Sequence, residues 1–217
     1  MNQIIQLQRL LLNSVGEHLT PLGFLPEAGS QSFHRTSTSG SNVFHLAFIK
    51  HEFDFDVTAD VAVRLDAVEE LIERVVGRHT NAKKRLTYTV GAELGNILGT
   101  GQLRWSVESA NSVPTVARQI FESFESVALP YYENASSAEK VYALLKSGGR
   151  KSWIHCPINL VRAKTVLALA FLLNRNHDIE PLEKEYIKHL SDLDDPGLPD
   201  FKDFVKSIKT LLRENRI

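Results

Sequence analysis

The sequence predicts an α+β protein: an antiparallel sheet of about five strands with helices packed on one face, followed by an all-helical C-terminal extension. Apolar and polar residues alternate from Glu52 to Asp60, which is typical of a strand with one face on a core. Short polar turns join this stretch to its apolar neighbours and favour antiparallel pairing. From residue 133 the pattern is helical alone. We therefore predict a sheet domain over residues 1–132 and a helical extension over 133–217 packed on it.

The elements of the predicted sheet domain follow from the spacing of its apolar residues. Where they recur every three or four positions we expect a helix, and where they alternate we expect a strand. Asp66 and Glu69 have the spacing of a capping box at a helix start. In chain order we expect a helix at 3–19, strands at 32–35 and 43–50, a bend at 50–52, a central strand at 53–65, a helix at 66–76, strands at 83–90 and 103–107, and a helix from Pro114 to Val127.

The predicted extension consists of helices with distinct start and stop signals. Ser136 and Glu139 again have capping-box spacing, and Gly148-Gly149 would end that helix. An almost wholly apolar helix that starts at Pro157 or Asn159 and runs to Leu173 must be buried between other elements. Amphipathic helices are expected at 181–190 and 199–213.

Composition excludes several classes of function. The 217 residues carry a formal net charge of −1, which gives no global attraction to nucleic acid or to an anionic membrane. The single cysteine, Cys156, rules out an internal disulfide and suits a reducing compartment. Residues 1–12 lack the basic region of a signal peptide, and no apolar run approaches the roughly 20 residues of a membrane span. We expect a soluble, cytoplasmic protein.

The most informative electrostatic feature is a cluster of acidic residues around the central strand. Between Val43 and Glu70, seven acidic side chains stand against two basic ones, Lys50 and Arg64. We predict that the polar face of this strand is exposed. It is either a solvated face, a docking surface for a basic protein partner, or a divalent-metal site, although two convergent carboxylates are too few for a metal. The candidate binding residues are Glu52, Asp54, Asp56 and Asp60.

Other chemically interesting residues have simpler interpretations. His34, His45 and His51 show no zinc-type spacing and are expected to be partly buried and hydrogen-bonded. His155 and Cys156 are adjacent in an extended segment, where their side chains would point to opposite faces and could not form a catalytic pair. The glycines between residues 91 and 101 lack the order of a phosphate loop. No cofactor or metal is expected, and no nucleic-acid or membrane partner.

Several short motifs together resemble one bacterial family, the domain of unknown function numbered forty-three oh four. The resemblance spans roughly residues 3–147 and implies a small α+β fold similar to the immunity proteins of bacterial toxin systems, which bind a toxin without catalysis. No catalytic residues are defined for that family. The motifs are Leu22-Gly23-Phe24, Phe33-His34-Arg35, Phe55-Asp-Val-Thr-Ala-Asp-Val61, Arg104-Trp105 and Leu129-Pro130-Tyr131-Tyr132.

The leading hypothesis is therefore a non-enzymatic binding protein of immunity type, which uses the acidic face of the central strand on a basic partner. One alternative is a hydrolase or transferase with its site between the sheet and the C-terminal helices. Another is an adaptor protein that binds through the helical extension. The oligomeric state stays open at this point.

Overall fold

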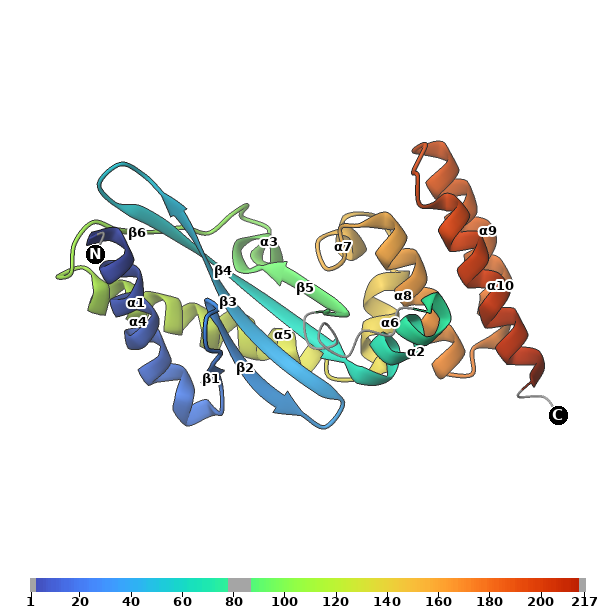
Figure 1. Cartoon of the computed structure of the whole chain (residues 1–217), viewed down its shortest axis with the longest axis horizontal. Coiled ribbons are helices and arrows are strands. Elements are labelled where there is room, and N and C mark those ends of the chain that lie inside the picture. The colour runs from blue at the N-terminus through green and yellow to red at the C-terminus, as the bar shows by residue number, and fades with distance from the viewer. Residues whose placement is uncertain (1–2, 78–86, 215–217) are drawn as a thin grey trace. The chain divides into compact units, whose positions relative to one another are not determined.

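The computed structural model describes residues 3–77 and 87–214 and has the predicted α+β fold, with an antiparallel sheet and an all-helical C-terminal region (Figure 1). By contacts between residues the chain divides into two compact units. The first comprises residues 1–63 and 91–134, and the second comprises residues 64–90 and 135–217. The helix that follows the central strand thus groups with the C-terminal helices, whereas the division by composition places it with the sheet.

The sheet is a meander in which neighbouring strands follow each other in sequence. Its order is β1-β2-β3-β4-β5, and β6 pairs with the beginning of β4, where Phe55 faces Val107. In the β2–β3 pair, Ser32 faces His45 and Phe33 faces Phe44. The strands are β1 (Leu25–Pro26), β2 (Ser32–Ser37), β3 (Gly40–Lys50), β4 (Phe55–Leu65), β5 (Val90–Glu93) and β6 (Trp105–Val107).

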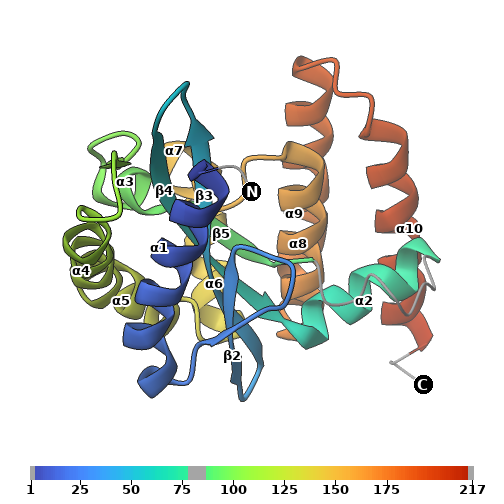
Figure 2. The ribbon, with the colours of Figure 1, turned by 60° about the vertical axis from the view of Figure 1, so that its left-hand side comes forward.

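The helices of the first unit cover one face of this sheet (Figures 1 and 2). Helix α1 packs along α4, and Phe24, directly after the first helical segments, lies edge-on to Phe124 with ring centroids 5.0 Å apart. Phe44 of β3 meets the same Phe124 ring at 5.1 Å, and the Tyr132 hydroxyl donates to the Val43 carbonyl at 2.8 Å. The helical elements are α1 (Gln3–Leu19), η1 (Thr20–Leu22), α3 (Leu94–Leu98), α4 (Val113–Ser123), η2 (Phe124–Ala128) and α5 (Leu129–Asn134).

The register predicted for the central strand is confirmed on its apolar face and wrong on two other points. Phe55, Val57, Val61 and Val63 are all buried. Phe53, however, lies in the turn before β4 and is 80% exposed, because the strand begins two residues later than predicted. Asp54, Asp56 and Asp60 are half-buried rather than exposed.

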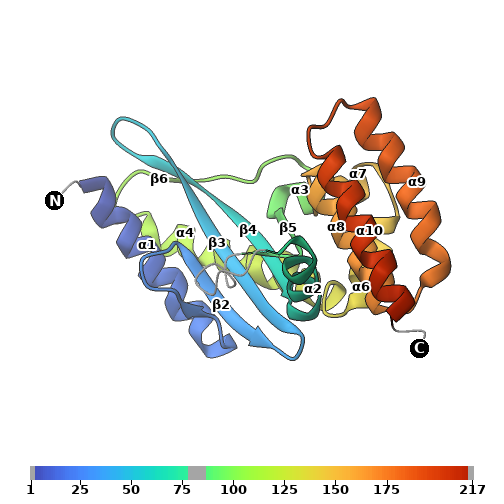
Figure 3. The same ribbon diagram turned by 45° about the vertical axis from the view of Figure 1, so that its right-hand side comes forward.

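The second unit is built around one buried helix, as the sequence predicts. Helix α8 packs against α2, α6, α9 and α10, and all residues from Ala163 to Ala170 are buried (Figure 3). Pro181 lies inside α9 instead of starting it. The helices are α2 (Asp66–Val76), α6 (Ala138–Lys146), α7 (Gly149–Trp153), α8 (Asn159–Leu172), α9 (Asn176–Asp192) and α10 (Leu198–Glu214).

Two predicted helix caps differ from the structure because other partners compete for the same side chains. Asp66 accepts from Arg64 Nε at 2.7 Å, and Glu69 Oε1 accepts from the Thr89 hydroxyl at 2.8 Å, so these two residues do not form a capping box. The N-cap of α6 is Ser137, whose hydroxyl accepts from the Lys140 amide, and not Ser136. Of the predicted strand at 83–90, residues 83–86 lie outside the described ones, and among residues 87–90 only Val90 is in a strand, as the first residue of β5.

The burial of α8 generates a stability prediction. Leu169→Asp should lower the free energy of unfolding by about 4 kcal/mol, because an unpaired carboxylate would enter a core position. Leu169 is fully buried, whereas Leu193 at the end of α9 is more than half exposed, so Leu193→Asp is the matched control and should cost much less. The measurement is denaturant unfolding of both variants. Equal stabilities would contradict the central role of α8.

Candidate functional site

The four acidic residues singled out in the sequence do not form one continuous row. Glu52 and Asp54 lie in the turn between β3 and β4, which is closed by a hydrogen bond from the His51 amide to the Asp54 carbonyl at 3.0 Å. Asp56 and Asp60 lie on β4 itself, on the face opposite the aromatic core. The structure thus separates a pair in the turn from a pair on the strand.

Asp56 is held by polar neighbours from both flanking segments. Ser106 of β6 donates from its Oγ to Asp56 Oδ1 at 2.6 Å, His51 Nε2 lies 3.3 Å from Oδ2, and Arg104 Nη1 lies 3.7 Å from the same oxygen. The hydrogen bond from Ser106 is the main cause that lowers the pKa of Asp56, and His51 and Arg104 act in the same direction. The negative charge of Asp56 is therefore compensated by hydrogen-bond donors and basic side chains of the first unit.

Asp60 belongs to a second, half-buried polar group. Burial raises the pKa of Asp60, and the nearby Glu93 adds to the rise, whereas His45 opposes it. Burial likewise lowers the pKa of His45, against the effect of Asp60. His45 Nδ1 lies 2.9 Å from Ser32 Oγ. Serine, histidine and aspartate thus occur on three neighbouring strands, β2, β3 and β4.

This arrangement does not have the geometry of a catalytic triad. In a triad the carboxylate orients the imidazole through one ring nitrogen while the other accepts the serine proton. Within the described part of the chain no ion pair joins His45 to Asp60, and the hydrogen bond to Ser32 occupies His45 Nδ1. The group stabilises the polar face of the sheet without providing an activated nucleophile.

The end of the β3–β4 hairpin carries the most exposed large hydrophobic side chain in the described residues. Phe53 is 80% exposed, and the next, Ile158, is 63% exposed. In Figures 1 and 3 the loop between β3 and β4 forms the far end of the long β3–β4 hairpin, and β6 pairs with the first residues of β4 next to it. We call the segment 50–54 the hairpin tip. It contains Phe53 between the acidic residues Glu52 and Asp54, with Lys50 and His51 before them.

The sequence predicts the bend at 50–52 but not its extension to Asp54, because Phe53 continues the alternation of the central strand. A strand that began at Phe53 would bury the ring. The hydrogen bond from the His51 amide to the Asp54 carbonyl places Phe53 inside the turn.

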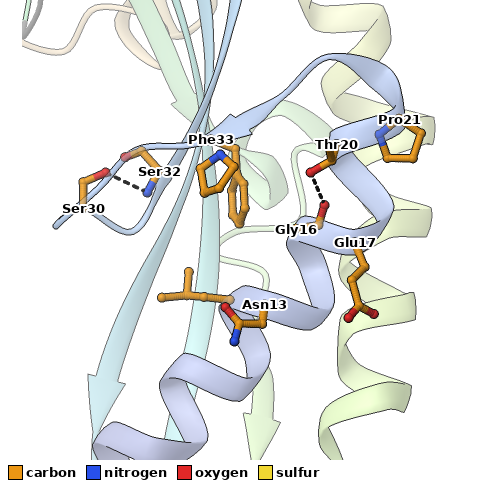
Figure 4. A pocket seen from close by; sticks show the side chains of 10 residues that line it. Asn13, Gly16, Glu17, Thr20, Pro21, Ser30, Ser32 and Phe33 are labelled. Carbon is orange, nitrogen blue, oxygen red and sulfur yellow. Dashed lines mark hydrogen bonds between the residues drawn. The ribbon is translucent and has the colours of Figure 1, made fainter.

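An open groove in the same unit lies between α1 and the β1–β2 turn (Figure 4). Its volume is about 710 Å³, and Phe33 lies between Ser32 and Gly16 at its base. Gly16 permits this close approach, because an added Cβ would lie 3.2 Å from the Phe33 ring. The polar groups satisfy one another: Thr20 donates to the Gly16 carbonyl, and the Ser32 amide donates to Ser30 Oγ. The groove therefore presents no polar group that requires a ligand.

Neither a cluster of metal ligands nor an activated cysteine is found in the described residues. In the described residues, no three side chains of His, Cys, Asp or Glu come together as metal ligands would. Cys156 is buried, and burial raises the pKa of its thiol to about 11, so it is protonated at neutral pH and a poor nucleophile.

Comparison with known proteins identified no relative of this chain. The chain matches no model of a known protein family, no curated protein and no solved structure. The resemblance to an immunity-protein-like family thus stays a prediction from short motifs. Of the helices in residues 3–77 and 87–214, none has the length and apolar character required to cross a membrane.

The network around Asp56 makes a prediction that can be measured directly. Ser106→Ala removes the hydroxyl donor, so the pKa of Asp56 should rise toward that of an ordinary aspartate. A lowered carboxyl pKa contributes stability that is fully present above the unfolded-state pKa, near pH 4, and is lost as the pH falls through the folded-state pKa. The variant should therefore be less stable than the parent at neutral pH, and the two should converge below the lowered pKa of Asp56.

An NMR titration of the Asp56 carboxyl carbon measures the shift. Ser123→Ala serves as the control, since Ser123 bonds only the Gln119 carbonyl of its own helix among the contacts described. An unchanged Asp56 titration in Ser106→Ala would contradict the assignment.

Proposed function

We propose that this is a non-enzymatic binding protein that docks its hairpin tip on a basic protein partner. The observation that supports this most strongly is the exposure of Phe53 at the end of the β3–β4 arm. Single exposed aliphatic residues are common on protein surfaces, but an aromatic ring at 80% exposure forgoes the burial that would stabilise the fold. Such rings are the usual anchors of protein interfaces.

The chemistry of the tip defines the partner. Burying a phenylalanine side chain contributes about 2 kcal/mol, which requires an apolar pocket on the partner. Glu52 and Asp54 flank the ring on both sides and outnumber the single permanent cation, Lys50. A pocket with a basic rim therefore has the best electrostatic complementarity.

The four predicted binding residues take different roles in this proposal. Glu52, which is exposed, and Asp54, which is half-buried, lie beside Phe53 in the turn and would adjoin the partner. Asp56 and Asp60 are half-buried, and Asp56 is bound by Ser106, so these two stabilise the arm and add only to the long-range negative potential. The resemblance to immunity proteins suggests a bacterial toxin domain as the partner, and that part of the proposal rests on the resemblance alone.

The role of Phe53 can be tested with the product of the neighbouring gene, made without its enzymatic activity if it is a toxin. Phe53→Ala should weaken binding by about 2 kcal/mol, roughly thirtyfold, because the apolar anchor is lost. Leu98→Ala is the control, since Leu98 is also an exposed apolar residue of the first unit but lies away from the tip, in α3. Biolayer interferometry measures both. Equal affinity of the two variants would overturn the role of the hairpin tip.

The charges of the tip should act mainly on the rate of association. Glu52→Gln with Asp54→Asn should slow association at low salt and flatten its salt dependence, because charges at the rim of an interface steer the encounter of the partners. The control pair, Glu122→Gln with Glu125→Gln, removes the same charge from exposed positions at the end of α4 and in η2. Association rates at low and high salt provide the measurement. The same salt slope in both double variants would exclude a specific contribution of the tip.

A further inference from the structure

The second unit contains a cavity that the proposed function does not use. It has a volume of about 450 Å³ and is lined by α2, residues 87–88, α8 and α10. This volume lies in the range of pockets that bind small organic molecules. All of its lining residues belong to the same compact unit.

One wall of the cavity is apolar. Ile72 and Val76 come from α2, and Leu160 and Val161 come from the first turn of α8. Val161 is partly exposed and marks the rim, whereas the helices beneath it are packed. A ligand with a hydrocarbon chain or ring would bury apolar surface here, which is the usual source of affinity in such pockets.

The charged residues of the cavity are predominantly acidic. Glu69, Glu73 and Asp200 face a single cation, Lys164. Lys164 is neutralised by Asp200, whose Oδ2 accepts from its Nζ at 2.7 Å. Glu69 Oε1 accepts from the Thr89 hydroxyl. Neither contact involves Glu73, whose Oε2 has no hydrogen-bond partner in the described residues.

Glu73 Oε2 is shielded from solvent, and no group in residues 3–77 or 87–214 donates a hydrogen bond to it. A shielded carboxylate oxygen without a donor costs free energy, because its lost hydration is not replaced. A ligand that brought a charged N–H donor to this oxygen would remove the cost. A ligand carboxylate would instead meet three acidic side chains.

We propose that this cavity binds a small organic amine. The protonated nitrogen donates to the Glu73 carboxylate, and the hydrocarbon part lies along Ile72 and Leu160. The wall formed by residues 87–88 is held in advance, because Arg64 Nη1 donates to the Thr87 carbonyl at 3.0 Å. Preformed walls reduce the entropy lost on binding.

Matched probes of equal length test the chemical class. Hexylamine, hexan-1-ol and hexanoate have the same hydrocarbon chain and differ in the head group. In NMR titrations of the full chain, hexylamine should perturb residues of α2 and the start of α8 and bind at least tenfold more tightly than hexan-1-ol, because a hydrogen bond to a charged group is stronger than a neutral one. Equal binding of the alcohol, or tighter binding of hexanoate, would overturn the proposal.

Two variants locate the site by independent means. Glu73→Gln should weaken hexylamine binding about tenfold, whereas Glu70→Gln, an exposed neighbour on the same helix, should not. Val161→Phe narrows the cavity at its partly exposed rim and should abolish binding without altering Glu73. Circular dichroism establishes that each variant is folded. Unchanged affinity in both Glu73→Gln and Val161→Phe would show that the amine binds elsewhere.

Discussion

Burial of one face of β4 is the constraint on which the sheet unit depends. Alternate residues from Phe55 to Val63 are at most 1% exposed, and the aromatic cluster around Phe124 packs on the same side of the sheet. Shifting the register by one residue would place Asp56, Thr58 and Asp60 in the core in place of this apolar set. The shifted register would therefore be much less stable than the observed one. The same constraint determines which carboxylates occupy the opposite face and leaves Phe53 beyond the start of the strand.

The opposite face of β4 shows how a sheet accommodates carboxylates without leaving them free. Ser106 and two basic side chains surround Asp56, and His45 lies near Asp60. These contacts compensate for partial burial, because each charge keeps a donor or an opposite charge nearby. A partner that recognises this arm gains most from the residues that lack such compensation. The proposed contact is therefore at the tip rather than along the strand.

In the second unit, α8 also contains charged side chains that are buried and need partners. Arg162 and Lys164 belong to α8 and are largely buried, and both have acceptors: Arg162 donates to the Cys156 carbonyl at 2.6 Å and Lys164 to Asp200. Glu73, on the neighbouring α2, has a shielded oxygen without such a partner in the described part of the chain. A natural core tolerates few groups of this kind, because each loses its hydration without replacing it.

The sequence by itself determined the periodic features: the bounds of α1, the buried side of β4 and the burial of α8. Each of these depends on the spacing of apolar residues within one segment, and that spacing is a local property. The tertiary structure alone decided which partners the polar side chains find. Asp56 accepts a hydrogen bond from Ser106, which lies 50 positions away in the sequence. Glu69 accepts a hydrogen bond from Thr89 instead of capping α2. The exposure of Phe53 and the shielding of Glu73 Oε2 were decided in the same way, because both depend on which segments pack around the side chain.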